Sequence, residues 1–347
     1  MRREVGAARA VARETGGRLF LAGGAVRDLL LGRPVRDVDL VVEGDASRFA
    51  RGLAERLRVP LRRHERFDTA TLSLPGGRSL DVAATRRERY GRSGALPETA
   101  PGAPIAEDLE RRDFTINALA LELGRTPRLL DPLEGRKDLR RGLVRVLHAR
   151  SFLDDPTRIL RAVRYAARLG FRLAPSTRRW LVEAVEDGAL DRISADRLRR
   201  EVRLILEEPE RGRAVLLMGR LGVDSAIHPT LRRPDAVARL GRVGPDAGWL
   251  CYLLAWMGEV SAAEAQSVAA RLGLSRKDRR AIVAEGVPTG AVPGVRGADL
   301  IAAGVPQGPA IGRALARTRE AVRDGRIEPA GALAFALLIA RARGEKP

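Results

Sequence analysis

A single residue, Val38, separates two aspartates, Asp37 and Asp39, at the start of an apolar run that continues as Leu40-Val41-Val42. Side chains two residues apart on a strand point to the same face, so both carboxylates should converge on one spot. Convergent carboxylates suit Mg²⁺, which takes hard oxygen ligands from protein and substrate phosphates. In a two-ion arrangement, one ion activates an attacking hydroxyl and the other stabilises the leaving group. The spacing favours this centre over a pair of solvated aspartates at a strand end.

A Gly23-Gly24 pair precedes these aspartates, between a strand-like run and a helix that begins near Val26. Backbone N–H groups in such a turn, with the positive end of the helix, form a place for a phosphate. A lone Gly-Gly pair is a weak signal. Its position just before Asp37 and Asp39 is what makes a phosphate site the better interpretation.

Asp81 lies between Leu80 and Val82 in another strand-like run. Burying a carboxylate without a partner or a metal is costly, so Asp81 is the candidate third carboxylate. The alternative is an aspartate at a strand edge that pairs with an arginine.

Asp155, Arg158, Arg161 and Arg164 recur at a spacing of three residues, which predicts one shared helix face. An aspartate acceptor and an arginine donor can address the Watson–Crick edge of cytosine or adenine as a complementary base would. The alternative is an ordinary ion pair on a helix surface.

Short β-like runs carry the first group of residues: 18–22, 38–42, 69–74 and 79–83, with a turn at Pro75-Gly76-Gly77. After Asp155-Pro156 the apolar residues recur at helical spacing, as in 156–169, 176–187, 194–207 and 262–272. The pattern predicts an α+β chain with a small mixed sheet first and helices after it. The Gly- and Pro-rich segment 285–309 is typical of loops between the last helices.

The chain is strongly basic, with 63 lysines and arginines against 44 acidic residues and a formal charge of +19 over 347 residues. Such a charge indicates a polyanionic partner, although an arginine-rich surface can also reflect genome composition or habitat. Cys251 is the only cysteine, which excludes an internal disulfide and favours a reducing cytoplasm. No stretch is apolar enough for a membrane span, so a cytoplasmic location is expected.

Three ordered motifs resemble the class II tRNA nucleotidyltransferase and bacterial poly(A) polymerase family over roughly residues 18 to 210. They are Gly23-Gly24-Ala25-Val26-Arg27-Asp28 with Asp37-Val38-Asp39, then Arg111-Arg112-Asp113-Phe114-Thr115-Ile116-Asn117-Ala118, then Asp154-Asp155-Pro156-Thr157-Arg158 through Tyr165. The resemblance implies a head with a five-stranded sheet over residues 1–145, a helical neck that reads the nucleobase over 146–210, and a helical body and tail that bind RNA over 211–347. The implied reaction is template-independent addition of CCA, or part of it, to the tRNA 3′ end from CTP or ATP.

The resemblance also assigns roles to single residues. Gly24, with its neighbour Gly23, and Arg27 would bind the nucleotide phosphates, and Asp37 and Asp39 would hold magnesium. Arg112 would belong to the sugar and triphosphate site, and Asp113 would either contact the ribose hydroxyl or make a structural ion pair. Asp155 and Arg158 fall on the base-reading pair, with Arg161 and Arg164 nearby.

Some positions depart from the family pattern. Asp154-Asp155 replaces a common Glu-Asp, and the segment 191–196 shortens a Glu-Arg-x-x-x-Glu pattern by placing aspartates at both ends. Gly94-Ala95-Leu96-Pro97 resembles the version found in enzymes that add only the terminal A. His148 and His228 are not followed by Asp, so a phosphohydrolase site is not expected. Poly(A) synthesis, an inactive RNA-binding relative and a small-molecule nucleotidyltransferase remain alternatives.

Overall fold

A computed structural model describes residues 2–35, 38–64, 69–245, 247–285, 295, 297–323, 326–328 and 331–341. The chain divides into two compact units, Met1–Ser194 and Ala195–Pro347, and each is described by itself. The predicted division into head, neck and body stays a prediction.

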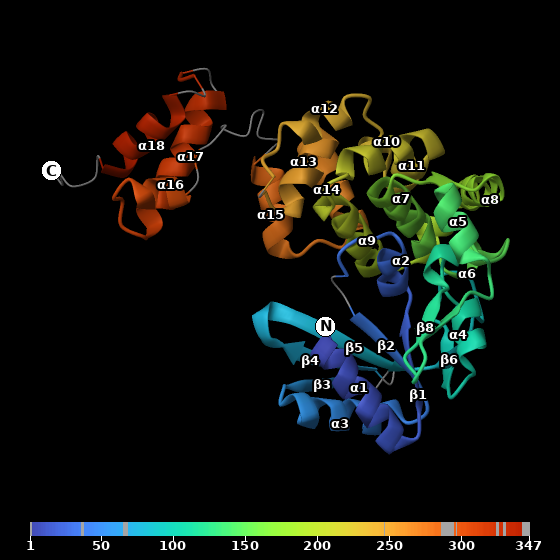
Figure 1. Cartoon of the computed structure of the whole chain (residues 1–347). Helices are drawn as coiled ribbons and strands as arrows, with labels where there is room; N and C mark the ends of the chain where they lie inside the picture. Colours follow the sequence, from blue (N-terminus) through green and yellow to red (C-terminus); the bar gives the residue numbers. More distant parts are fainter. Residues whose placement is uncertain are drawn as a thin grey trace. The chain divides into compact units, whose positions relative to one another are not determined.

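The first unit is built around a seven-stranded sheet with the order β3-β4-β5-β2-β1-β8-β9 (Figure 1). The β2 and β5 strands run parallel and the other neighbours are antiparallel, so the sheet is mixed. The strands are β1 (Arg18–Ala22), β2 (Val38–Glu43), β3 (Leu61–His64), β4 (Thr69–Leu74), β5 (Arg78–Ala84), β8 (Ala120–Glu122) and β9 (Arg128–Leu130). Two small pairs lie outside it, β6 (Arg86–Arg89) with β7 (Glu98–Pro101) and β10 (Leu143–Val144) with β11 (Arg172–Leu173).

Alternation along the strands gives the sheet one buried face and one polar face near β2, β4 and β5. Leu40, Leu72, Leu80 and Val82 are buried, and the helix α3 (Ala46–Leu57) packs against these strands. The buried positions of α3 recur at helical spacing, which is why this segment forms a helix with one apolar side. Asp45 begins the helix by accepting a hydrogen bond from the Arg48 N–H at 2.8 Å. The opposite face of these strands is left for polar side chains.

Other helices of the first unit carry the remaining site residues. Helix α7, for example, buries Ile159, Ala162, Val163 and Ala166 along one side. The helices are α1 (Arg2–Thr15), α2 (Gly24–Leu30), α4 (Ile105–Glu110), α5 (Gly135–Arg141), α6 (Ser151–Asp154), α7 (Thr157–Leu169) and α8 (Pro175–Glu186), with 3₁₀ turns η2 (Pro75–Gly77), η3 (Thr115–Asn117) and η4 (Ala189–Arg192).

The described part of the second unit is helical. Its helices are α9 (Ala195–Glu207), α10 (Arg211–Leu221), α11 (Val223–Ile227), α12 (Ala236–Gly241), α13 (Trp249–Met257), α14 (Ala262–Arg271), α15 (Arg276–Glu285), α16 (Gly297–Ala302), α17 (Pro309–Arg323) and α18 (Ala332–Arg341), with the 3₁₀ turn η5 (Pro229–Leu231). Helix α13 is apolar almost throughout, and Tyr252 and Trp256 are among the largest fully buried side chains of the protein.

The structure confirms the α+β class, and β1 and β4 have the predicted bounds. Three details differ from expectation. The sheet has seven strands and not five, because three-residue strands β8 and β9 extend its edge. A two-residue strand, β11, also occurs after Pro156, where only helices were predicted, because it pairs with β10. Helix α16 begins inside the segment 285–309 that was predicted as loops, and residues 286–294 and 296 lie outside the described part.

Gly135 makes a close contact between α5 and η3 that tests this packing. A Cβ at Gly135 would lie 2.2 Å from the carbonyl oxygen of Thr115. We expect Gly135→Ala to lower the free energy of unfolding by about 1–3 kcal/mol, because the added methyl group forces the backbone to shift. Urea denaturation measures the change. Gly6→Ala in α1 is the matched control: a Cβ there meets nothing within 4 Å, so that variant should be unchanged or more stable.

Candidate active site

A row of polar side chains crosses the open face of the sheet. Asp39 on β2 lies opposite Asp81 on the parallel strand β5, and Asp81 lies opposite Thr71 on β4. The Thr71 hydroxyl donates a 2.6 Å hydrogen bond to Asp81 Oδ1. Asp81 is exposed, although its apolar sequence neighbours Leu80 and Val82 suggested that it would be buried. Alternation along the strand directs those neighbours to the α3 face and Asp81 to the opposite face. Two carboxylates thus stand side by side, as the third-carboxylate hypothesis requires.

Asp37, the other predicted metal ligand, lies outside the described residues. The donor set that is described fits a hard divalent cation, because Asp39 and Asp81 offer carboxylate oxygens on one face. Within the described ranges, no three or more His, Cys, Asp or Glu side chains lie together so that they could hold a metal ion.

The Gly23-Gly24 turn comes directly beside this row, since the strand register pairs Leu21 with Leu40. Gly23 has a φ of +70°, and its N–H donates to the Leu119 carbonyl at 2.9 Å. A Cβ at Gly23 would lie 2.6 Å from Nη1 of Arg112, so only glycine lets this guanidinium approach the turn. The predicted phosphate turn and the predicted triphosphate arginine are therefore neighbours.

Arg112 is held in place by Asp108, whose side chain is fully buried. Asp108 Oδ2 accepts from Arg112 at 3.0 Å, and Oδ1 accepts from Arg111 at 2.7 Å. Burial alone would raise the pKa of Asp108, but the charges of Arg112 and Arg111 and their hydrogen bonds outweigh it and hold the pKa below its ordinary value. Asp108 is therefore a charged group that orients both arginines.

Arg27 is almost completely buried, with 3% of its surface exposed. Its Nε donates to Asp28 at 2.8 Å and its Nη1 donates to the side-chain oxygen of Asn117 at 2.7 Å. The side chain also packs beside Gly24, where a Cβ would lie 3.5 Å from Nη2. Arg27 thus lies against the Gly-Gly turn, and Asp28 and Asn117 hold its guanidinium in place.

Asp113 is buried and pairs with Arg161 of helix α7. Its Oδ2 accepts from Arg161 at 2.9 and 2.6 Å, and its Oδ1 accepts from the side-chain amide of Asn117 at 2.9 Å. Burial would raise the pKa of Asp113, yet Arg161 and Asn117 lower it below the usual range. Of the two roles predicted for Asp113, this geometry favours the structural ion pair.

Arg158 is buried on α7 and Asp155 precedes that helix. Arg158 donates to Ser151 Oγ at 2.7 Å, to the Arg111 carbonyl at 3.0 Å and to the Tyr90 hydroxyl at 3.3 Å. Asp155 has extended backbone and accepts from the Thr157 N–H at 3.0 Å. The spacing predicted that Asp155 and Arg158 share a helix face, and for Asp155 this prediction is wrong. The bend at Pro156 ends one helix and begins the next, which accounts for the difference.

Tyr165 lies among three arginines of the predicted site. The guanidinium carbons of Arg27, Arg161 and Arg164 lie 5.1, 5.6 and 5.0 Å from its ring centroid. Attraction between each cation and the ring offsets part of the repulsion among the three charges. Arg164 therefore belongs to the same cluster as Arg27 and Arg161, as the motif spacing suggested.

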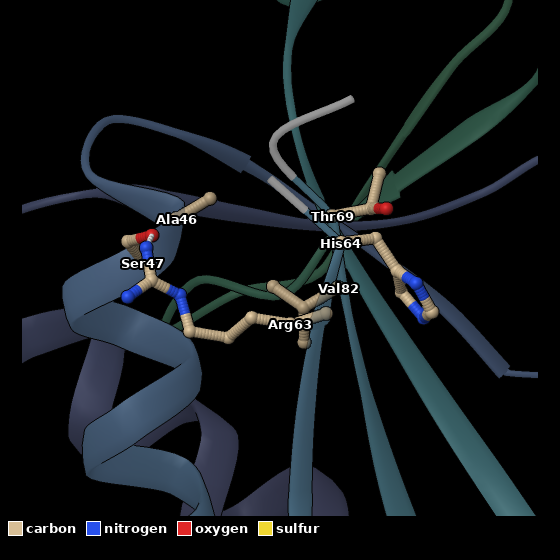
Figure 2. A pocket seen from close by; sticks show the side chains of 7 residues that line it. Ala46, Ser47, Arg63, His64, Thr69 and Val82 are labelled. Carbon is tan, nitrogen blue, oxygen red and sulfur yellow. Dashed lines mark hydrogen bonds between the residues drawn. The ribbon is translucent and has the colours of Figure 1, made fainter. Parts of the chain in front are cut away.

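A separate pocket lies on the α3 side of the sheet (Figure 2). Figure 2 shows the Arg63 side chain directed toward Ser47, to whose hydroxyl it donates at 3.0 Å, while His64 points away. Ala70 and Val82 in its lining face away from Thr71 and Asp81 by strand alternation. This part of the pocket thus lies on the face opposite the acidic row, whereas His64, another lining residue, lies 3.4 Å from the Thr71 hydroxyl.

Sequence reasoning missed several partners of the predicted residues. Asp108 carried a detectable signal, because its spacing to Arg111 and Arg112 is that of helical ion pairs. Tyr90 and Ser151 carried no such signal. They lie 68 and 7 residues from Arg158 in the sequence, and the fold brings them into contact with it. Burial raises the pKa of Tyr90 to about 12, so its phenol stays a neutral hydrogen-bonding group at neutral pH.

Known proteins bear on this arrangement. A model of the poly A polymerase head domain matches residues 19–145. A CC-adding tRNA nucleotidyltransferase of Deinococcus radiodurans is 34% identical over 333 residues, which cover 90% of this chain and 86% of that relative. The chain belongs to the tRNA nucleotidyltransferase family. An A-adding tRNA nucleotidyltransferase of Geobacter sulfurreducens is 41% identical over 244 residues, 70% of this chain and 27% of that relative.

Solved structures of the family share the fold. A Thermotoga maritima CCA-adding enzyme in complex with tRNA superposes with a TM-score of 0.67 at 29% identity, covering 98% of this chain and 78% of that chain. The chain spans only 23–46% of the length of the A-adding relatives that it matches. In the described part of the chain, no helix has the length and apolar character needed to cross a membrane.

Asp108 supplies a pH-dependent test of the site. Asp108→Asn removes the carboxylate that pairs with Arg112 and one of the two that pair with Arg111, which keeps Glu88 at 2.7 Å; breaking a buried pair costs about 3–5 kcal/mol of unfolding free energy. Because the pKa of Asp108 in the folded protein lies below its ordinary value of 3.8, its contribution is fully present above that value and is lost as pH falls further.

The difference in unfolding free energy between the parent and Asp108→Asn, measured from pH 7 down to pH 3, should therefore stay constant above about pH 4 and narrow by about 1 kcal/mol by pH 3. A difference that stays constant down to pH 3 would show that the pKa of Asp108 is not lowered in the folded protein. Glu55→Gln on the exposed side of α3 is the control and should be neutral throughout.

Proposed function

We propose that this chain adds nucleotides to the 3′ end of tRNA without a nucleic-acid template, using CTP or ATP and releasing pyrophosphate. The observation that carries the proposal is the placement of Asp39 and Asp81 beside the Gly23 turn and Arg112. Carboxylates for a metal and a glycine turn for phosphates thus lie on neighbouring central strands of the sheet, β5, β2 and β1. The names of the similar proteins support the same reaction.

In this proposal Asp37 and Asp39 hold Mg²⁺, and Asp81, which is in register with Asp39, is the third carboxylate. The bound ions would polarise the attacking 3′-hydroxyl and the departing pyrophosphate. Arg112 approaches the triphosphate across Gly23, and Asp108 keeps its guanidinium in that orientation. Arg27 stabilises the turn from its buried side.

Selection of the base falls to Asp155 and Arg158 in this proposal. Asp155, which is partly buried, would accept from the exocyclic amino group shared by cytosine and adenine, and Arg158 would donate to the ring nitrogen. A guanidinium carries five N–H donors, so Arg158 can be anchored by Ser151 and Arg111 and still address a base.

The second unit would bind the tRNA backbone. Its exposed arginines can neutralise phosphates and release counterions, which makes affinity depend on salt. They include Arg200, Arg203, Arg213 and Arg220. Cytoplasmic tRNA is the corresponding substrate.

The direct test supplies purified protein with tRNAs that end at each truncation of CCA, labelled CTP or ATP, and Mg²⁺. We expect incorporation by the parent and a loss of roughly a thousandfold or more in Asp39→Ala, because several kcal/mol of transition-state stabilisation depend on the metal. Filter binding should give the same tRNA affinity for both proteins.

Glu55→Ala, an exposed carboxylate on α3, is the matched control and should retain full activity. The product length separates the alternatives: one to three added nucleotides indicate CCA synthesis or part of it, and long ATP-dependent tails indicate poly(A) synthesis. Full activity in Asp39→Ala, or tRNA binding with no incorporation by the parent, would contradict the proposal.

Asp155→Ala tests base selection. Removing one partner of a hydrogen-bonded reading pair costs about 1–3 kcal/mol, so discrimination of CTP and ATP against UTP and GTP should fall roughly 10- to 100-fold. The ratio of kcat/KM among the four nucleotides measures this. Asp154→Ala, which removes the neighbouring carboxylate that faces Arg150, should leave the ratio unchanged. An equal loss for all four nucleotides in Asp155→Ala would assign Asp155 to folding of the neck.

A further inference from the structure

Asn117 joins two arginines that lie on different elements of the first unit. Its Oδ1 accepts from Arg27 of α2 at 2.7 Å, and its Nδ2 donates to Asp113 at 2.9 Å. Asp113 in turn accepts two hydrogen bonds from Arg161 of α7. The result is a continuous buried chain, Arg27–Asn117–Asp113–Arg161, in which every link is 2.9 Å or shorter.

The chemistry of this chain requires an amide at residue 117. The group must accept from a cation on one side and donate to an anion on the other, and among side chains of this length only asparagine does both at neutral charge. A carboxylate would face Asp113 with a second negative charge. A hydroxyl is too short to span the gap that the amide fills. Asn117 is 5% exposed, so water cannot easily substitute for it.

The ring of Tyr165 supports the same pairing from a second side. Arg27 and Arg161 lie 5.1 and 5.6 Å from its centroid, and Phe114 meets its ring edge-on with centroids 5.7 Å apart. Arg27 lies against Gly24 of the phosphate turn, while Arg161 belongs to the helix that carries Arg158. The chain therefore connects the phosphate side of the nucleotide site to the base side.

We infer that Asn117 is a positioning residue, whose side-chain amide holds Arg27 and, through Asp113, Arg161 in a fixed relation for nucleotide binding. This inference rests on the proposed function, because it takes a nucleoside triphosphate as the ligand. Asn117 would act through these two arginines and not through a contact of its own with the nucleotide.

Asn117 is the only asparagine in the 347 residues, which allows a direct measurement. Protein labelled with ¹⁵N at the asparagine side-chain amide gives one pair of NH₂ resonances. We expect this pair to be protected from solvent exchange, to shift in Arg27→Lys, and to shift again when pyrophosphate or ATP with Mg²⁺ is added to the parent. A pair that exchanges freely, or that ignores both Arg27→Lys and the added ligand, would overturn the inference.

The kinetic test uses Asn117→Asp, which keeps the shape of the side chain and changes only its hydrogen bonding and charge. Loss of one buried partner predicts a rise in the nucleotide KM of roughly 10- to 100-fold, with kcat less affected and tRNA affinity within about twofold of the parent. The double variant Asp113→Asn with Asn117→Asp exchanges carboxylate and amide along the chain. It should recover part of the lost affinity, because it restores the charge balance.

Thr177→Val is the matched control, since Thr177 is fully buried and its hydroxyl oxygen accepts from the Val146 N–H away from the chain. It should lose stability without a change in KM. If Asn117→Asp changes stability alone, the residue is structural and the inference fails. If Asn117→Asp does not fold, the amide resonances of the parent and Arg27→Lys still decide. A parent protein that incorporates no nucleotide would contradict the proposed function, whereas an unchanged KM in an active Asn117→Asp would contradict only this inference.

Discussion

Buried positive charge is the constraint on which the first unit depends. Arg27 and Arg158 have only 3% and 4% of their surfaces exposed, and Arg112 and Arg161 are partly covered. Guanidinium groups do not lose their proton in proteins, so burial is possible only beside carboxylates, carbonyls, amides or aromatic rings. Asp108 and Asp113 supply the buried negative charge, and Asn117, Ser151 and Tyr165 supply the remaining contacts.

The acidic residues of this unit divide into two kinds by their surroundings. Asp108 and Asp113 are buried against arginines, which lower their pKa and commit their oxygens to ion pairs. Asp39 and Asp81 stand on the open face of the sheet, in register on parallel strands. Carboxylates of the first kind orient side chains, whereas those of the second kind remain near the surface where a hydrated cation and a substrate can reach them.

Gly23 determines how closely Arg112 approaches the acidic row of Asp39 and Asp81. Because Gly23 has no Cβ, Arg112 can lie against the turn that follows β1, next to the acidic row. Asp108 orients Arg112 from the far side, and the chain through Asn117 orients Arg27. Binding groups held by a second layer of hydrogen bonds lose less conformational entropy when a nucleotide arrives.

Local patterns in the sequence determined the strands β1, β2, β4 and β5 and the helix α7, because each depends on a repeat of two or three to four residues. The motifs around Gly23, Asp39 and Arg158 could be identified from the residue types and their order along the chain. The pairing of Asp39 with Asp81, the link of Arg27 to Asn117 across 90 residues and the contact of Tyr90 with Arg158 across 68 were decided only by the tertiary structure. Short strands such as β8 and β9 carry too few residues to show a period. A buried arginine takes whichever acceptor the folded backbone brings within reach, and no local spacing encodes that choice.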